Sequence, residues 1–288
     1  MKLTIHGYST ALYSTWYCIE ELGILFDAGD GVVSHLLGKS GKIKQVFVSH
    51  EDRDHLAGLL AYNQLCAFHK PKIYFPKDTN SFRFLDEFFK KFDPQSLGTE
   101  WIPIQDKAVI KTKGGIQVEA VQNEHVIRAG QKSLSYKVFE TKRKLKAEFI
   151  NLNKYELIKV KTENGEDFLT EEIKTNILSF SGDTPVTDYE RFNGSKILIH
   201  ESTFLTRSET NQKQGKNLHS SLEEVMEMVS NIEVEQLILG HFSSRYDQGE
   251  VDQTIKKMKQ HYGIKIPVHR IPIGKAVFNI LGNDKCKM

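Results

Sequence analysis

Side chains that could bind metal ions follow several of the predicted strands. The segment SHEDRDH offers four of them directly after an apolar run, namely His50, Asp52, Asp54 and His55. Other ligand-type side chains are Asp27, Asp30, His125, Asp183, His200, Glu201, His219 and His241, most of them at the ends of apolar runs. Neighbouring strands lie only about 4.8 Å apart, so ligands at adjacent strand ends converge. A mixture of imidazoles and carboxylates favours Zn, Mn or Fe and argues against an iron–sulfur cluster.

A single histidine in such a sequence has an ordinary explanation. Most lone histidines are surface residues or hydrogen-bonded core residues, and this interpretation suits His35, His69, His261 and His269. SHEDRDH is different, because its four ligand-type side chains lie between an apolar strand and an apolar helix. A charged surface loop is the alternative interpretation of that segment. The two aspartates of the FDAGDG turn are expected to bond backbone amides or to orient ligating histidines.

Hydrophobic periodicity predicts the elements that position these side chains. Short β-rich runs alternate with amphipathic segments, which is typical of a single α/β domain. Strands are predicted at LTIHG, YCIEELGILFDAG, KIKQVFVSH, KIYFP, WIPI, AVIKT, IQVEAVQN, NILSFSGDT, KILIHEST, QLILG, IPVHRIP and KAVFNIL. Helices are predicted at HLAGLLAYNQLCAF, with Leu56, Leu59, Leu60 and Leu65 on one face, and at FRFLDEFFKKF, HSSLEEVMEMVSNI and VDQTIKKMKQHY. Ser220 and Glu223 have the spacing of a capping box at the start of the third helix.

Composition narrows the class of protein. The 288 residues are 39% apolar and 26% charged, which is enough to build a core and excludes disorder of the whole chain. Lys and Arg total 39 against 37 Asp and Glu, so any binding of anions must be local. Three scattered cysteines, Cys18, Cys66 and Cys286, fit a reducing compartment. Without an export signal or a long apolar segment, the sequence predicts a soluble cytoplasmic protein.

Several motifs together resemble a known family. VFVSHEDRDHLAGL is similar to the HxHxDH signature of the metallo-β-lactamase superfamily. Five further features occur in the order found in its tRNase Z (ribonuclease Z) branch, and they are ILFDAGDG, His125, SGDT, HEST and HFSSRY. Members of that branch are endoribonucleases that trim the 3′ end of precursor tRNA. The resemblance extends over about residues 2 to 250, and HFSSRY is its most branch-specific part.

The resemblance implies a fold, a metal centre and a set of roles. The implied fold is an α/β αββα sandwich of two mixed sheets with helices on the outer faces, formed by residues 1–288 as one domain. Two divalent ions are implied, with zinc as the first choice. The implied ligands are His50, Asp52 and His125 at site one, Asp54, His55 and His241 at site two, and Asp183 between the sites. The implied catalytic residues are Asp54, His219 and Glu201, with Ser243 and Arg245 as substrate-binding residues. A homodimer is implied as well.

The sequence departs from the family pattern most clearly at position 52. An aspartate stands where the family has the second histidine of its motif, so the segment has the form HxDxDH. The additional carboxylate adds negative charge to site one and favours harder ions such as Mn or Fe. The alternative is a weak or empty site one and a protein with a single metal ion. The first loop, IHGYST, also lacks the family's glycine-rich turn.

A second departure lies at about residues 140–175, where the family carries an arm that grips tRNA. This segment lacks the Gly- and Pro-rich tip of that arm, but residues 142–161 hold seven Lys or Arg against two Glu. Such a charge balance attracts phosphates if the cations share one face. A solvated β-hairpin is the alternative. The sequence thus predicts a charged insertion in place of the arm.

Three functions compete at this point. The first is a metal-dependent phosphodiesterase that resembles tRNase Z and cuts the 3′ trailer of precursor tRNA with a metal-activated water. The second keeps the metal centre but acts on a small phosphodiester or another small ester. The third is a weakly active or non-catalytic binding protein with an altered metal site. HEST, NLHSS and HFSSRY favour the first, because they go beyond bare metal binding.

Overall fold

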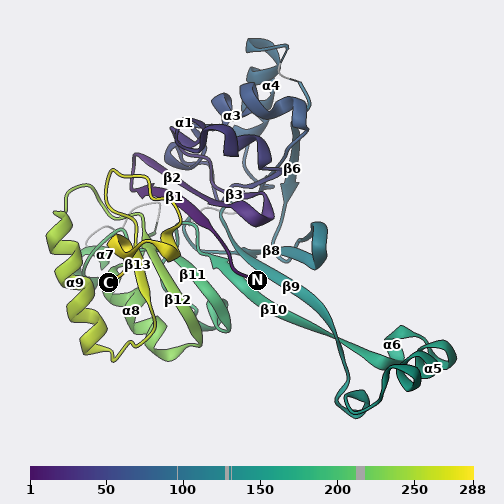
Figure 1. Cartoon of the computed structure of the whole chain (residues 1–288). Coiled ribbons are helices and arrows are strands. Elements are labelled where there is room, and N and C mark those ends of the chain that lie inside the picture. Colours follow the sequence, from purple (N-terminus) through teal and green to yellow (C-terminus); the bar gives the residue numbers. More distant parts are fainter. Residues whose placement is uncertain (96, 127–129, 131, 212–217) are drawn as a thin grey trace.

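Two mixed β-sheets pack face to face, and helices cover their outer faces (Figure 1). The computed structural model describes residues 1–95, 97–126, 130, 132–211 and 218–288. This arrangement is the αββα sandwich that the resemblance implied. The predicted fold class is therefore confirmed.

The first sheet contains six strands in the order β1-β2-β3-β4-β5-β6. They are β1 Ile5–Thr10, β2 Ser14–Ile19, β3 Ile24–Phe26, β4 Gln45–Phe47, β5 Lys72–Pro76 and β6 Glu100–Ile104. β1 to β3 are antiparallel, whereas β3 to β6 are parallel. The carboxyl ends of the parallel strands meet at one edge of the sheet, which is where ligands bind in sheets of this kind. The FDAGDG and SHEDRDH segments begin at that edge.

The second sheet contains seven strands in the order β13-β12-β11-β10-β9-β8-β7. They are β7 Val109–Lys111, β8 Ile116–Gln122, β9 Leu134–Leu145, β10 Thr170–Phe180, β11 Ser195–Glu201, β12 Val234–Gly240 and β13 Val268–Arg270. β7 to β10 are antiparallel and β10 to β13 are parallel. The segments that follow β10, β11 and β12 carry SGDT, HEST and HFSSRY, so these three motifs also meet at one edge.

Helices pack on the outer face of each sheet. The first sheet is covered by α1 Val32–Leu36, α2 Arg53–Leu56, α3 Leu59–Cys66 and α4 Ser81–Phe92. The second is covered by α8 Leu222–Asn231 and α9 Gln248–His261, with α7 Arg207–Asn211 nearby. No helix in the described residues has the length and apolar character needed to cross a membrane.

An aromatic cluster fills the space between the two sheets. The rings of Phe26 and Phe180 have centroids 5.2 Å apart, and those of Phe47 and Tyr136 are 5.3 Å apart. All four side chains are buried, and burial of each contributes roughly 1.5–3 kcal/mol to folding. The Tyr136 hydroxyl donates a hydrogen bond of 2.6 Å to the carbonyl oxygen of Val48. This bond fixes the strand end that leads into SHEDRDH.

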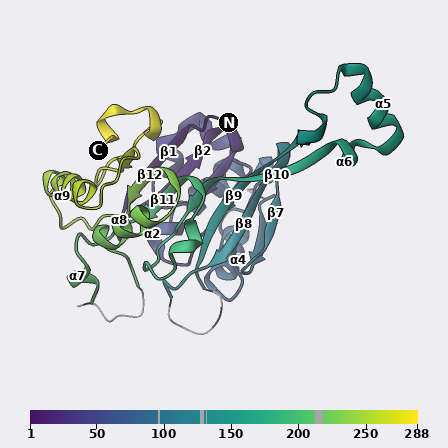
Figure 2. The same ribbon diagram turned by 90° about the horizontal axis from the view of Figure 1, so that it is seen from below.

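Strands β9 and β10 continue beyond the body of the protein as a long two-stranded arm (Figure 2). Their pairing runs from Tyr136↔Phe180 to Leu145↔Thr170. The tip carries α5 Lys154–Asn164 and α6 Glu166–Leu169. α5 begins with a capping box, in which Asn153 and Glu156 each bond the other's backbone N–H. From here on, the arm means residues 140–175, which are the outer part of this projection.

The structure corrects four details of the predicted elements. The helix after His55 is two helices, α2 and α3, and Leu65 is 56% exposed rather than on the buried face. The capping box of α8 is formed by Ser221 and Glu224, not by Ser220 and Glu223. Ser220 instead donates its hydroxyl to the carbonyl oxygen of Glu201. KAVFNIL forms no strand, and only an isolated bridge joins Val277 to Gly7.

Candidate metal centre

Four buried histidines, three from loops and one from helix α2, converge between the two sheets. His50 follows β4, His55 lies in α2, His125 follows β8 and His241 follows β12. The ring centroids of His50 and His55 are 4.1 Å apart, and those of His50 and His125 are 4.5 Å apart. Each ring is 3% exposed or less. Such crowding of imidazoles needs a specific cause, because burial disfavours their charged form.

The Nδ1 atom of each of these histidines is held by a neighbouring polar group. His55 Nδ1 lies 2.7 Å from Asp27 Oδ2, and His125 Nδ1 lies 2.7 Å from the carbonyl oxygen of Leu218. His50 Nδ1 lies 2.9 Å from Ser49 Oγ, and His241 Nδ1 lies 2.8 Å from Thr203 Oγ1. Groups of this kind fix the orientation of ligating histidines and leave Nε2 for the metal ion.

Three of the four Nε2 atoms in the cluster have no hydrogen bond among the described residues, and the fourth contacts Asp54. Those of His50, His55 and His125 are buried and without a hydrogen-bond partner in the described part of the chain. A buried polar atom without a partner costs about 1–3 kcal/mol. His241 Nε2 lies 3.3 Å from Asp54 Oδ2. Three inward-facing nitrogens left unpaired at one place fit a site for cations.

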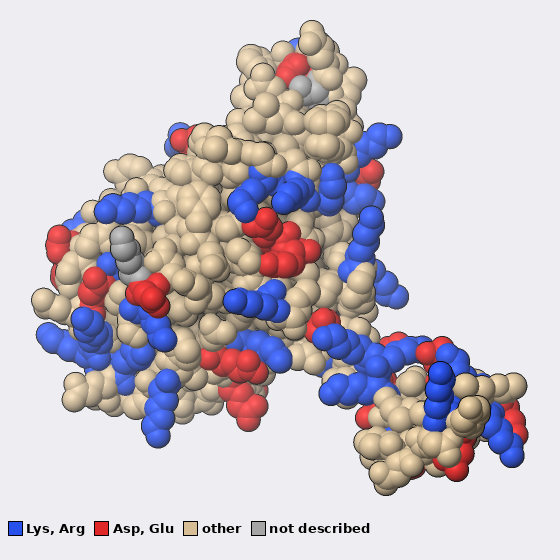
Figure 3. Space-filling view, viewed as in Figure 1, with Lys and Arg blue, Asp and Glu red and all other residues tan. Residues whose placement is uncertain are grey.

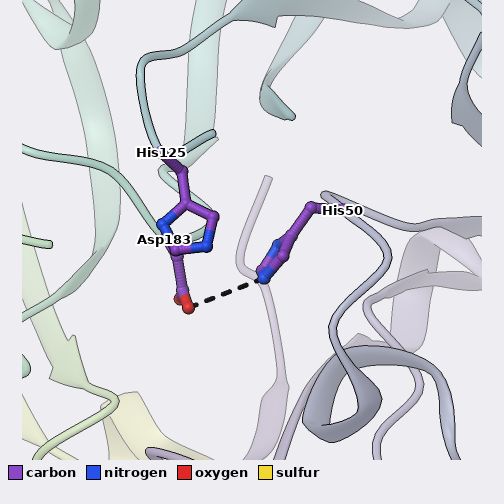
Figure 4. A group of neighbouring side chains, drawn as sticks. All are labelled: His50, His125 and Asp183. Atoms are coloured by element: carbon purple, nitrogen blue, oxygen red, sulfur yellow. Dashed lines mark ion pairs between the residues drawn. The ribbon is translucent and has the colours of Figure 1, made fainter. Parts of the chain in front are cut away.

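Asp183 lies among these nitrogens and contacts both halves of the cluster. Its Oδ2 atom is 3.7 Å from His50 Nε2, and Figure 4 shows this contact beside His125. The same oxygen is 3.3 Å from the Nε2 atoms of both His55 and His241. Three groups of potential ligands occur among the described residues, and they are His50, His125 and Asp183, then Asp54, His55 and His241, and then Asp183, His219 and His241. Asp183 therefore lies between the first two groups and within contact of both.

Asp52 lies at the outer side of the first group. Its Oδ2 atom is 3.6 Å from His50 Nε2 and 3.7 Å from His125 Nε2. Its side chain is 43% exposed, whereas both histidines are buried. The carboxylate that replaces the expected histidine therefore faces the same two nitrogens. All seven residues predicted as metal ligands thus lie in one cluster.

Protonation in the cluster follows from burial and close charges. Burial lowers the pKa of His50, and the neighbouring histidines lower it further. Contacts with His125 and His50 hold the pKa of Asp52 far below its usual range. Burial opposes charge on His55, but Asp183 and the other carboxylates outweigh it and raise its pKa well above the ordinary value. The carboxylates therefore favour positive charge at their centre, as a cation site does.

A second hydrogen-bonded group lies beside the metal cluster. Buried Glu201 accepts hydrogen bonds from the backbone N–H groups of Thr184, Thr203 and Ser220. Its Oε1 atom is 3.2 Å from His219 Nδ1. Burial alone would lower the pKa of His219, but Glu201, with Asp183, raises it to about 9. An imidazole that carries a proton at neutral pH is suited to proton donation.

Glycines allow the loops of the site to approach each other. A Cβ atom on Gly29 would lie 2.3 Å from the carbonyl oxygen of Asp54, and one on Gly58 would lie 2.2 Å from that of Gly29. Asp27, at the start of the same turn, has a φ of 53°. Its carboxylate accepts bonds from the N–H and the hydroxyl of Ser49. The FDAGDG turn therefore orients His55, as expected for Asp27.

Not every sequence candidate joins the cluster. His200 is buried against Phe192, with ring centroids 5.4 Å apart, and belongs to none of the ligand groups among the described residues. Arg245 pairs with Glu209 and lies over the Phe204 ring. Ser243 bonds Thr203 through its backbone N–H. These last two residues, predicted to bind substrate, are in the HFSSRY loop but not in the metal cluster.

Two contributors to the site were missed by sequence reasoning. The Thr203 hydroxyl contacts Glu201, His219 and His241 at 2.7, 3.2 and 2.8 Å. The Leu218 carbonyl oxygen orients His125 across 93 positions of the chain. The position of Thr203 inside HEST is a signal that could have marked it. A backbone carbonyl has no sequence signal.

Comparison with known proteins agrees with the fold described above and with the resemblance to tRNase Z. No family model matches the chain. The chain is 26% identical over 271 residues to the chloroplastic tRNase Z TRZ2 of Arabidopsis thaliana. This alignment covers 91% of the chain and 73% of the relative. The metallo-β-lactamase fold protein YhfI of Bacillus subtilis has a TM-score of 0.64 at 14% identity, covering 96% of this chain and all (100%) of the other. Human tRNase Z, short form, has a TM-score of 0.59 at 16% identity, covering 95% and 98%. The chain therefore has the metallo-β-lactamase fold, and its resemblance to the tRNase Z branch extends over most of its length.

Proposed function

We propose that the protein is a metal-dependent phosphodiesterase of the tRNase Z type, which cuts the 3′ trailer of precursor tRNA. The observation that carries this proposal is the convergence of His50, His55, His125 and His241, whose Nδ1 atoms are held while Nε2 faces the centre. The chain aligns over most of its length with relatives named tRNase Z and ribonuclease Z, and this supports RNA as the substrate.

The residues of the cluster fit two divalent cations. His50, Asp52 and His125 would hold one ion, Asp54, His55 and His241 the other, and Asp183 both. When bound, such ions lower the pKa of a water molecule and stabilise the charge that develops on a phosphodiester. Zinc suits the imidazoles, and the carboxylate of Asp52 shifts the preference toward Mn or Fe.

The remaining steps belong to this chain's own groups. Asp54 has its carboxylate at the centre and is the acceptor for the proton of the attacking water. His219 donates a proton to the leaving oxygen, and Glu201 holds its ring in place through Nδ1. Thr203 orients Glu201 and His241 together. Ser243 and Arg245 contribute to substrate binding at the edge of the site.

Other features of the proposal concern the whole chain. The 288 residues form a single domain, and the arm supplies contacts to RNA. We also propose that the protein is a homodimer and that it is located in the cytoplasm, which is a reducing compartment. The cysteines, Cys18, Cys66 and Cys286, are buried and free, which suits a reducing compartment.

Cleavage of a defined RNA tests the proposal. The metal-loaded protein is incubated with a precursor tRNA that carries a 3′ trailer, and the same tRNA without a trailer is the control. We expect release of the trailer as one product and no change in the control. Asp183→Ala should stop the reaction, whereas Asp86→Ala, which removes only a surface ion pair with Lys90, should not. Hydrolysis of bis(p-nitrophenyl) phosphate without trailer release would favour a small phosphodiester as substrate. No reaction on either would favour a non-catalytic binding protein.

A further inference from the structure

A pocket lies at the opposite ends of the strands that lead to the metal centre. One wall is formed by residues at the amino-terminal ends of β3, β4 and β5, including Gly23, Gln45 and Lys72. The other is formed by Lys111 of β7 and by Thr112 and the first residue of the short 3-10 helix Lys113–Gly115. The pocket thus lies between the edges of the two sheets, with a volume of about 510 Å³. Cavities that bind small ligands are typically about 300–1,000 Å³.

Lysines dominate the lining of this pocket, which we call the lysine pocket. Six of them contribute, and they are Lys42, Lys44, Lys70, Lys72, Lys111 and Lys113. The acidic lining residues are Glu20 and Glu21. Figure 3 shows blue side chains above and below a red acidic patch near the middle of the face drawn. The chain as a whole has a formal charge of only +2, so its positive charge is concentrated at this pocket.

Local carboxylates do not balance these lysines. Lys42 pairs with Glu20 at 3.4 Å and Lys72 with Glu100 at 3.4 Å. Hydrogen bonds from Lys39 and His6 lower the pKa of Glu20 to about 2, so its charge is already shared among several cations. Among the residues that the structure describes, no carboxylate pairs with the four other lysines, Lys44, Lys70, Lys111 and Lys113. Like charges that share a concave surface repel one another, and a bound anion relieves that repulsion.

The chemistry of the lining selects the class of anion. Lysine ammonium groups act as compact point charges with several donors, which suits phosphate oxygens that approach from different directions. No aromatic side chain lines the pocket in the described part of the chain, so stacking of a nucleobase has no support. Glu20 and Glu21 repel any anion, so binding requires contacts with several of the lysines at once. A ligand with several linked phosphates gains contacts with lysines on both walls at once.

We propose that the lysine pocket binds a chain of linked phosphate groups, independently of the metal centre. The phosphates come either from a free oligophosphate or from the backbone of an RNA strand. Binding requires lysines of both sheets, since Lys44 lies at one wall and Lys111 and Lys113 at the other. The pocket lies at the far ends of β3 and β4 from Asp27 and His50. Its loss therefore leaves the hydrolysis of small phosphodiesters unchanged.

Calorimetric titration of the metal-loaded protein with sodium tripolyphosphate tests the proposal. The pocket variant is Lys44→Gln, Lys111→Gln and Lys113→Gln combined, all at exposed positions. The matched control is Lys256→Gln, Lys265→Gln and Lys275→Gln, which removes three exposed lysines elsewhere and changes the net charge equally. We expect the pocket variant to bind roughly tenfold more weakly, since each exposed cation contributes a few-fold, and the control to bind like wild type. Equal affinity of all three proteins would overturn the proposal, as would equal losses in both variants.

Two further measurements keep the result specific. The combined variant Lys44→Arg, Lys111→Arg and Lys113→Arg keeps the charges and should bind like wild type, and weaker binding by it would also contradict the proposal. Thermal unfolding of each variant shows that the fold is retained. The source of the phosphates follows from a second ligand, an RNA oligonucleotide of mixed sequence. If its affinity falls in the pocket variant as that of tripolyphosphate does, RNA is the source; if only tripolyphosphate is affected, the source is a free oligophosphate.

Discussion

The metal centre and the arm are both rich in charged residues, but they differ in how those charges are held. In the centre, buried side chains contact one another at strand ends, and hydrogen bonds fix the Nδ1 atoms of His50, His55, His125 and His241. In the arm, residues 140–175 hold eight Lys or Arg and eight Asp or Glu. Several of these pair locally, as Arg143 does with Asp167 and Lys161 with Glu166.

Under the proposed function, this difference separates the residues of the reaction from those that bind substrate. Buried ligands that share one centre act as a unit, so we expect removal of one to affect the reaction on every substrate. Exposed ion pairs contribute only about 0–1 kcal/mol each and are screened by salt. We therefore expect the arm to add little to the stability of the body and to influence only substrates long enough to reach it.

The largest effect is expected from Asp54→Ala. The change removes a carboxylate that faces His55 and His241 at 3.5 and 3.3 Å and that we assign as proton acceptor. We expect a loss of at least about 10³-fold in kcat on both bis(p-nitrophenyl) phosphate and precursor tRNA. Steady-state kinetics measure this loss, and circular dichroism checks that the fold is intact. Activity close to wild type on either substrate would remove Asp54 from the mechanism.

A smaller loss is expected from His219→Ala. We expect kcat to fall about 10²–10³-fold while the metal content per chain stays the same, since we assign His219 as the proton donor and not as a metal ligand. Metal analysis and kinetics on the same sample separate the two roles. Because Asp183, His219 and His241 also form a potential ligand group, loss of metal would instead make His219 a ligand. A fully active variant would exclude it as the donor.

Shortening the arm should affect RNA alone. Lys146 N–H bonds the carbonyl oxygen of Leu169, so residues 146–169 can be replaced by Asn-Gly to close a hairpin between Leu145 and Thr170. We expect KM for precursor tRNA to rise about tenfold, with hydrolysis of bis(p-nitrophenyl) phosphate unchanged. An unchanged KM for RNA would mean that the arm is a solvated hairpin. A lower rate on the small substrate would contradict the separation of arm and centre.

The smallest effect on rate is expected from Asp52→His. An imidazole in place of the carboxylate removes negative charge beside His50 and His125 and should shift the bound metal toward zinc. Competition between Zn and Mn, followed by metal analysis, measures the shift. The rate should change by less than about tenfold. Unchanged preference would mean that Asp52 is no ligand.

Much of the centre could be predicted from the sequence because its signals are local. SHEDRDH follows an apolar strand, and the motifs with Asp183 and His241 follow others, so strand ends bring them together. The roles of single atoms could not be predicted in this way. The Leu218 carbonyl oxygen binds His125 through a long-range contact, and Ser220 bonds Glu201 rather than capping α8. Such contacts depend on tertiary packing.

The prediction for the arm was less complete for a physical reason. Its charged composition indicated a segment outside the core, which the structure agrees with. It did not predict α5, whose helix depends on the capping box of Asn153 and Glu156 rather than on an apolar face. Leu65 is exposed because α3 buries Leu59, Tyr62 and Cys66, and Leu65 lies off that face of the helix.

The central claim is that Asp52 takes part in a working centre for two metal ions. Metal content per chain, measured on protein purified without added metal, tests it most directly when hydrolysis of bis(p-nitrophenyl) phosphate is assayed on the same sample. The account predicts about two ions per chain together with turnover. One ion or none, with no turnover after addition of Zn or Mn, would contradict it.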